Sequence, residues 1–97
     1  MPNSDIFKAL ADPTRRRILH MLNQRPEMSA GEIAAGFDIS APSMSHHFNV
    51  LKEADLISAR REGQQILYSL NTTVVQDLMT MLIEMFAKDG KQARRNP

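Results

Sequence analysis

The spacing of apolar residues changes once along the chain and divides it into a helical and a β-forming part. Up to Leu56 apolar residues recur every three or four positions, as on helices that pack against a core. Over residues 57–70 they alternate in two runs around Gly63, which predicts a β-hairpin. A largely apolar segment over residues 71–87 then predicts a final helix. We therefore expect a mostly α fold with a small β-hairpin, of the α+β class.

Four helices are expected before the hairpin, over about residues 5–11, 13–23, 29–37 and 40–54. Asp12 is a capping residue followed at once by a proline, and Ser29 stands at capping-box spacing from Glu32. Ser40 caps the fourth helix, with Pro42 in its first turn. The third and fourth helices lie about three residues apart, which predicts a helix-turn-helix that the hairpin extends into a winged helix-turn-helix.

The fourth helix has an apolar side and a polar side. Met44, Phe48 and Leu51 stack on one face at 100° per residue. The opposite side is short, rich in hydrogen-bond donors and free of acid until Glu53, which suits a DNA groove. A capped amphipathic helix with an ordinary polar exterior is the simpler alternative. The candidate DNA contacts here are Ser40, Pro42, Ser43, Ser45, His46, His47, Asn49 and Lys52.

The last helix is apolar over roughly 200° of its circumference, about twice the stripe that packing on one core requires. Half of this surface is expected to pack on the chain's own core and half on a second copy. A ligand pocket lined by its methionines is the alternative. The candidate dimer-interface residues are Phe7, Leu10, Leu78, Met79, Leu82, Met85 and Phe86.

Length and composition set the frame for these elements. The 97 residues predict one domain over residues 1–88, followed by a basic flexible tail over residues 89–97. No apolar run approaches the roughly 18 residues of a membrane span, and the N-terminus lacks a signal-peptide pattern. We therefore expect a cytoplasmic protein without membrane insertion.

The net charge is only +1, so an interaction with nucleic acid must depend on where the basic residues lie. Residues 15–17 are three successive arginines, which we expect to form a solvated helix face. Arg60 and Arg61 lie in the hairpin, and Gln64 follows its glycine. These three are expected to contact phosphates or an adjacent minor groove.

The sequence offers little for catalysis or metal binding. It has no cysteine, no nucleophile elbow and no glycine-rich phosphate loop. His46 and His47 point about 100° apart on a helix, whereas zinc-binding pairs use a spacing of four. We expect no catalytic residue, no metal site and no cofactor. A winged-helix docking module that binds protein instead of DNA is the alternative. The outward donors favour DNA, and they are Ser43, Ser45, His46 and Asn49.

The order of these elements resembles that of the ArsR/SmtB family of bacterial winged-helix repressors. The resemblance covers about residues 5–86 and rests on ALADPTRRRIL at 9–19, SAPSMSHHFNVLKEADLI at 40–57 and RREGQQILYSL at 60–70. It implies a homodimer that represses transcription, in some members that of its own operon, by binding double-stranded palindromic operator DNA. The metal-independent autorepressor type is the most similar. The family does not say whether an inducer or a protein partner relieves repression here.

Three departures from the family pattern matter. The metal sensors carry cysteines or clustered histidines and acids, whereas the last helix here offers only Asp77 and Glu84. Asp38 stands in the turn where glycine is usual. Aspartate tolerates the left-handed conformation expected there, so this departure costs little. Gln64 replaces the usual arginine after the hairpin glycine, which weakens one expected phosphate contact.

Overall fold

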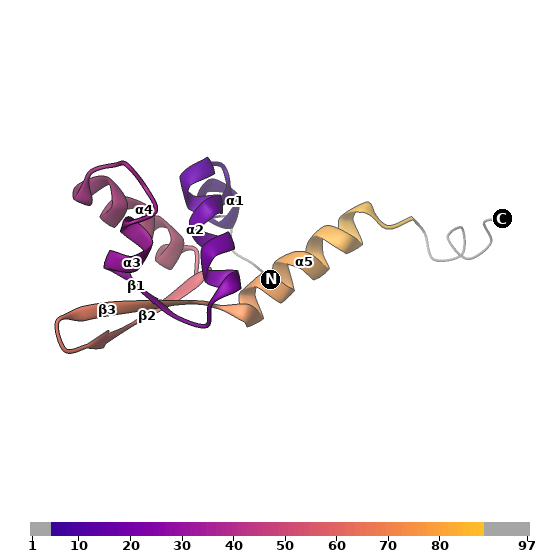
Figure 1. Ribbon diagram of the computed structural model, residues 1–97. Helices are drawn as coiled ribbons and strands as arrows, with labels where there is room; N and C mark the ends of the chain where they lie inside the picture. Colours follow the sequence, from indigo (N-terminus) through magenta and orange to yellow (C-terminus); the bar gives the residue numbers. More distant parts are fainter. Residues whose placement is uncertain (1–4, 89–97) are drawn as a thin grey trace.

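The computed structural model describes residues 5–88 and contains five helices and three strands in this part of the chain (Figure 1). The elements in order are α1 (Asp5–Leu10), α2 (Pro13–Gln24), β1 (Met28–Ser29), α3 (Ala30–Ala34), α4 (Ala41–Glu53), β2 (Ile57–Glu62), β3 (Gln65–Leu70) and α5 (Thr72–Phe86). The predicted mostly helical fold with a hairpin is confirmed. The tail predicted over residues 89–97 lies outside the described residues.

The sheet has one strand more than the sequence predicts. Met28 and Ser29 form the short strand β1, which pairs antiparallel with β3 and gives the strand order β1-β3-β2. Tyr68 of β3 thus lies between Met28 of β1 and Ala59 of β2. Two residues are too few for a period-two pattern, so the sequence carried no signal for this strand.

The predicted helix starts are confirmed by their hydrogen bonds. The Asp12 carboxylate accepts from the backbone N–H groups of Thr14 and Arg15 at the start of α2. Ser29 and Glu32 form the reciprocal capping box of α3, with N–O distances of 3.0 and 2.8 Å. The starts of these two helices are therefore fixed by side chains that the sequence identified, whereas α3 ends at Ala34, three residues before its predicted end.

The expectation of a left-handed residue at Asp38 is wrong. Among the described residues positive φ occurs at Asp55, with φ 60°, and at Gly63, with φ 64°. The turn of the helix-turn-helix therefore needs no glycine in this chain. The left-handed residue instead follows α4, where Asp55 turns the backbone toward β2, and the Asp55 N–H bonds the Lys52 carbonyl at 2.9 Å.

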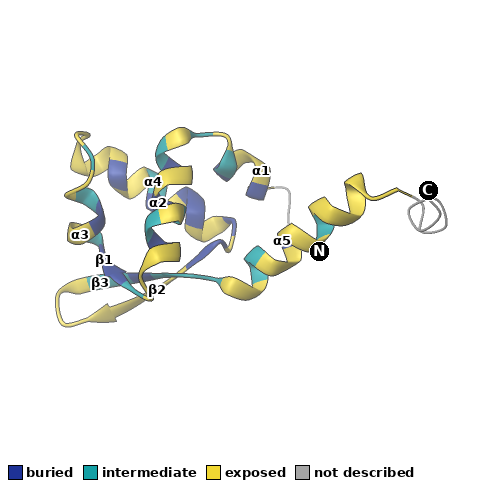
Figure 2. Cartoon of the chain, turned by 45° about the vertical axis from the view of Figure 1, so that its right-hand side comes forward, coloured by how far each residue is buried: buried dark blue, intermediate teal, exposed yellow. Residues whose placement is uncertain are grey.

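The core lies where α1, α2, α3 and α4 meet the base of the hairpin (Figure 2). Its largest fully buried side chains are Ile6, Ile18, Ile33, Leu51 and Leu56. Phe48 of α4 stacks on Tyr68 of β3, with ring centroids 4.5 Å apart and planes inclined by 27°. This pair joins the predicted reading helix directly to the wing.

The helix α5 leaves this core on the side opposite the hairpin tip (Figure 1). Leu78 is its one buried residue, and Val74, Val75 and Met81 are half-buried against the core. These four residues cover part of the apolar surface of α5 with its own chain, and the other apolar residues of the helix are exposed: Met79, Leu82, Ile83, Met85 and Phe86. Within residues 5–88 no helix is both long and apolar enough to cross a membrane.

Replacing Phe48 with alanine removes the aromatic contact between α4 and β3 and leaves a cavity beside Tyr68. We expect the free energy of unfolding to fall by about 3–5 kcal/mol, measured by urea denaturation. Ile39→Ala is the control, since Ile39 is exposed, and its change should stay within about 0.5 kcal/mol. Equal losses in the two variants would contradict the assignment of Phe48 to the core.

Candidate nucleic-acid interface

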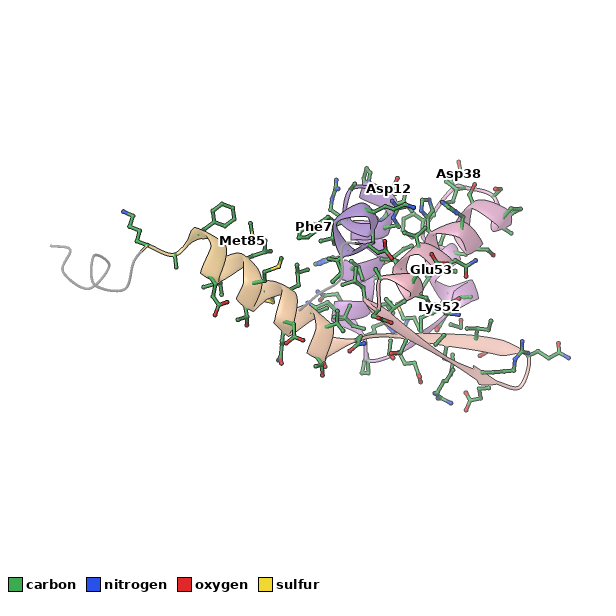
Figure 3. The ribbon with its side chains drawn as sticks, turned by 180° about the vertical axis from the view of Figure 1, so that it is seen from behind. Phe7, Asp12, Asp38, Lys52, Glu53 and Met85 are labelled. Atoms are coloured by element: carbon green, nitrogen blue, oxygen red, sulfur yellow. The ribbon has the colours of Figure 1, made fainter. Side chains whose placement is uncertain are left out.

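The outward side of α4 is a continuous polar surface above the buried Met44, Phe48 and Leu51. The predicted contacts Pro42, Ser43, Ser45, His46, Asn49 and Lys52 are all exposed. Lys52 lies on the part of the body remote from α5 (Figure 3). The structure therefore brings these six residues together on one side of a rigid helix, which we call the α4 polar face.

Two of the serines at the start of α4 bond to each other. Ser40 Oγ accepts from the backbone N–H of Ser43 at 3.2 Å and donates to Ser43 Oγ at 3.1 Å. Ser40 is thus first of all the cap of α4, and the Ser43 hydroxyl retains its own hydrogen to donate. Both side chains remain exposed at the N-terminal end of the α4 polar face.

His47 differs from the other predicted contacts because it turns toward the core. Its side chain is 15% exposed, and its Nδ1 lies 3.1 Å from a terminal guanidinium nitrogen of Arg15. A guanidinium can only donate, so Nδ1 is the acceptor in this hydrogen bond. Nδ1 also lies 3.9 Å from the Asp12 carboxylate. The structure gives His47 an internal partner, and its predicted DNA contact stays a prediction.

Arg15 is buried, and the expectation that residues 15–17 form a solvated face is wrong for it. Its guanidinium donates to the carbonyls of Ala9 at 2.9 Å and Lys8 at 3.0 Å, as well as to His47. These bonds satisfy the C-terminal end of α1 and connect it with α4. The signal was present in the sequence, since Arg15 lies three and seven positions before Ile18 and Leu22 and so shares their buried face.

The other two arginines of this run are exposed but engaged. Arg16 donates to the Leu10 carbonyl at 2.7 Å, and the Arg17 guanidinium lies 4.8 Å from the centre of the Phe37 ring. None of the three is a free cation toward DNA. The guanidinium groups of this run instead attach α2 to α1 and to the segment between α3 and α4.

Asp12 combines the N-cap of α2 with a place beside this cluster. Partial burial tends to raise the pKa of the Asp12 carboxyl, but hydrogen bonds from the backbone of Arg15 and Thr14, together with the nearby His47 and Arg15, hold it below its ordinary value. A lowered pKa in the folded state means that Asp12 stabilises the fold above its unfolded pKa. This contribution is lost as the pH falls through the lower, folded value.

The two hairpin arginines lie on opposite faces of the sheet. Neighbouring strand residues alternate between faces, and directly opposed residues share one. Arg61 is opposite Ile66, which packs on the core, whereas Arg60 is opposite Leu67 on the other face. Arg61 therefore lies on the helix-facing side of the hairpin. Gln64 is exposed in the turn beside it.

The Arg60 guanidinium is paired with Glu27 and is not free to bind a phosphate. Its Nε and one terminal nitrogen donate to the two carboxylate oxygens of Glu27 at 2.7 and 2.9 Å. This hydrogen bonding lowers the pKa of Glu27 and raises that of Arg60. Arg61, in contrast, has no ion-pair or hydrogen-bond partner within residues 5–88. Sequence reasoning grouped the two arginines and missed Glu27.

The candidate dimer surface is apolar and mostly uncovered. Phe7 of α1 and Met85 of α5 lie on the same side of the molecule (Figure 3), and Met79, Ile83 and Phe86 are 55, 67 and 79% exposed. Ile83 was not among the predicted residues, although it lies one turn after Met79. Leu78, in contrast, is already buried in the chain's own core, so its side chain is not free for a partner.

A hollow of about 310 Å³ lies beside this surface, between α2, the end of the hairpin and α5. It is lined mainly by apolar side chains, including Leu10, Leu19, Val75 and Met79. Within the described part of the chain no three histidines or acids lie close enough to hold a metal ion. Asp77 and Glu84 are both exposed on α5.

Comparisons with known proteins agree with this geometry. A family profile described as a helix-turn-helix domain matches residues 10–59. The transcriptional repressor SdpR of Bacillus subtilis is 52% identical over 85 residues, which cover 88% of this chain and 93% of SdpR. The region matched by the family profile contains the whole helix-turn-helix and the start of the wing.

Solved structures give the same result. An ArsR family transcriptional regulator superposes with a TM-score of 0.76 at 30% identity, covering 84% of this chain and 82% of the regulator. HlyU of Vibrio cholerae superposes with a TM-score of 0.69 at 30% identity, covering 87 and 90% of the two chains. The similarity therefore extends beyond the helix-turn-helix to nearly the full fold.

The buried position of Arg15 leads to a prediction for stability. Arg15→Lys keeps the charge but cannot reproduce three bonds from one planar group, and buried carbonyls lose their donors. We expect the free energy of unfolding to fall by about 1–3 kcal/mol in urea denaturation. Arg17→Lys on the same helix is the matched control and should change it by less than about 0.5 kcal/mol. A loss no larger than that of the control would show that the Arg15 bonds contribute nothing.

Proposed function

The chain belongs to the ArsR/SmtB family of helix-turn-helix transcriptional regulators, and from this we propose that it is a homodimeric repressor that binds a palindromic operator. It is a DNA-binding transcriptional regulator and not an enzyme. SdpR is named a transcriptional repressor, and we propose that this chain likewise represses transcription. Because its proposed target is operator DNA, we propose that it acts in the cytoplasm.

The observation that carries the proposal is the α4 polar face. Its hydroxyl, amide, imidazole and ammonium groups project from a helix whose other side is fixed in the core. A major groove admits one helix, and amides and hydroxyls there can read base edges. We assign base reading to Ser43, Ser45, His46 and Asn49. Ser40, Pro42, His47 and Lys52 flank them, and Lys52 is suited to a phosphate.

The wing is proposed to contact the DNA backbone or an adjacent minor groove. Arg61 is the residue suited to this role, because its guanidinium is uncompensated and lies on the helix-facing side of the sheet. Gln64 in the turn can add a hydrogen bond but no charge. We propose a smaller role for Arg60, whose charge is neutralised by Glu27.

The dimer is proposed to form through α5 and α1. The exposed apolar side chains of α1 and α5 form a surface whose contact with water is unfavourable. They are Phe7, Met79, Leu82, Met85 and Phe86, to which we add Ile83. Leu10 and Leu78 line the adjoining hollow, so they are proposed to support the interface from beneath. A two-fold axis through this surface would present two copies of α4 to two operator half-sites about one helical turn apart.

No metal cofactor is part of the proposal. Metal sensing requires ligands that converge on one ion, commonly thiolates, imidazoles and carboxylates. The chain has no cysteine, and the exposed Asp77 and Glu84 of α5 lie seven residues apart. We propose that repression is relieved by something other than a bound metal.

The division between base reading and backbone contact can be tested with one selected operator and one random duplex. Asn49→Ala should weaken operator binding by roughly 1–3 kcal/mol while leaving random DNA unchanged, because only a base contact is lost. Arg61→Ala should weaken both and reduce the slope of log Kobs against log salt by about one. Fluorescence anisotropy measures both quantities.

Gln76→Ala on α5 is the control for this experiment, since Gln76 is exposed and remote from α4. It should bind both duplexes like the wild type. If Asn49→Ala and Arg61→Ala leave DNA binding intact and abolish binding of a protein partner, the docking-module alternative is correct.

The dimer is tested by placing a charge in the apolar surface. Leu82→Asp should raise the dimer dissociation constant at least about a hundredfold, because an unpaired carboxylate is costly to bury and each 1.4 kcal/mol is about tenfold. Thr80→Asp adds the same charge on the polar side of α5 and should dimerise like the wild type. Sedimentation velocity measures both, and a wild-type monomer at micromolar concentration would refute the proposal.

A further inference from the structure

The ion pair between Arg60 and Glu27 crosses the sheet. Glu27 directly precedes β1, Arg60 belongs to β2, and β3 lies between these strands. The two hydrogen bonds of 2.7 and 2.9 Å engage both carboxylate oxygens. Glu62 adds a second acid, with its carboxylate 3.8 Å from the remaining terminal nitrogen of Arg60. The Arg60 guanidinium is therefore surrounded by negative charge on the side where it lies.

The next residue is in the opposite state. Arg61 is one position further toward the hairpin tip and has no ion-pair partner within the described chain. Two successive arginines of one wing thus differ in the charge that they can offer to a phosphate. The difference is set by Glu27, a residue outside both the hairpin and the helix-turn-helix.

The pair is exposed enough to open. Arg60 is 55% exposed and Glu27 33%, and exposed ion pairs contribute little to folding stability. A phosphate is also a bidentate partner for a guanidinium and competes for the same donors. If Arg60 turned to DNA, however, the Glu27 carboxylate would be left unpaired near the backbone. Each contact that neutralises a phosphate releases counterions and raises affinity without reading sequence.

We propose that Glu27 limits non-specific affinity by withholding Arg60 from the DNA backbone. The inference rests on the proposed function, in that the wing must lie against DNA. With Arg60 withheld, the wing supplies one strong cationic contact per protomer instead of two. Binding then depends more on the α4 polar face, so that discrimination between operator and random DNA is larger than two free arginines would allow.

The test needs no knowledge of the operator, because it measures binding to a random-sequence duplex of about 30 base pairs. The full chain is compared as wild type, Glu27→Gln, Arg60→Gln and the double variant, by anisotropy between about 50 and about 200 mM KCl. In Glu27→Gln, Arg60 is free, so log Kobs should fall with log salt more steeply by about 0.9 per protomer. Its affinity should exceed that of the wild type, and this advantage should shrink about threefold per protomer over the range.

The other variants separate this effect from a general change in charge. Arg60→Gln should keep the wild-type slope, and the double variant should lack the steeper slope of Glu27→Gln, because that steeper slope requires the Arg60 guanidinium. Glu84→Gln removes the same charge from α5, away from the hairpin, and should leave the slope unchanged. Melting curves confirm that all variants are folded.

Two results would overturn the inference. An unchanged slope in Glu27→Gln would mean that the freed Arg60 does not reach a phosphate. Weaker binding by Glu27→Gln would mean that the ion pair holds the wing in its binding position and so assists DNA binding. If the wild type binds no DNA at all, the proposed function fails first, and this inference fails with it.

Discussion

The packing of α4 against the hairpin is the contact on which the rest of the arrangement depends. Phe48 lies on Tyr68 at a centroid distance of 4.5 Å, while Met44 and Leu51 of the same helix face are buried with it. Three anchors along one side leave α4 no freedom to rotate about its axis. The same contact fixes the hairpin, because Tyr68 is in β3, the middle strand of the sheet. The helix α4 and the hairpin are therefore held together as one unit, and in the proposed function both would face the same DNA.

The distribution of charge follows from this unit rather than from the net charge of +1. Arg15 and Arg16 are used to satisfy carbonyls at the end of α1, and Arg60 is paired with Glu27. These cations are engaged within the protein and do not contribute a broad positive surface. Within residues 5–88, the exposed Arg61 and Lys52 have no acidic partner. In the proposed function this distribution leaves few cations for phosphates, so base contacts would supply a larger share of the affinity.

The sequence predicted those features that depend on local chemistry. The caps at Asp12, Ser29 and Ser40, the buried face of α4 and the hairpin around Gly63 follow from residues a few positions apart, and they are confirmed. Features that depend on distant partners were missed. The strand β1 exists because β3 pairs with it, and Arg60 is neutralised by an acid 33 positions away. Arg15 was misjudged for another reason, since its charge was given more weight than its place on the buried face of α2. Whether the candidate contacts of α4 read bases is a property of the complex, which no pattern in one chain contains.

The exposure of α5 connects dimerisation with folding itself. An isolated helix of 15 residues is marginal in water, and most helical stability comes from packing an apolar face. Here α5 packs on its own chain through Val74, Val75, Leu78 and Met81. From Leu82 to Phe86 every residue of α5 is exposed, so the monomer supplies almost nothing to hold this last part of the helix. If a second copy covers this part of α5, as we propose, the contact that joins the two protomers also stabilises the C-terminal part of the helix. Protomer concentration would then govern both the order of the second half of α5 and the occupancy of an operator.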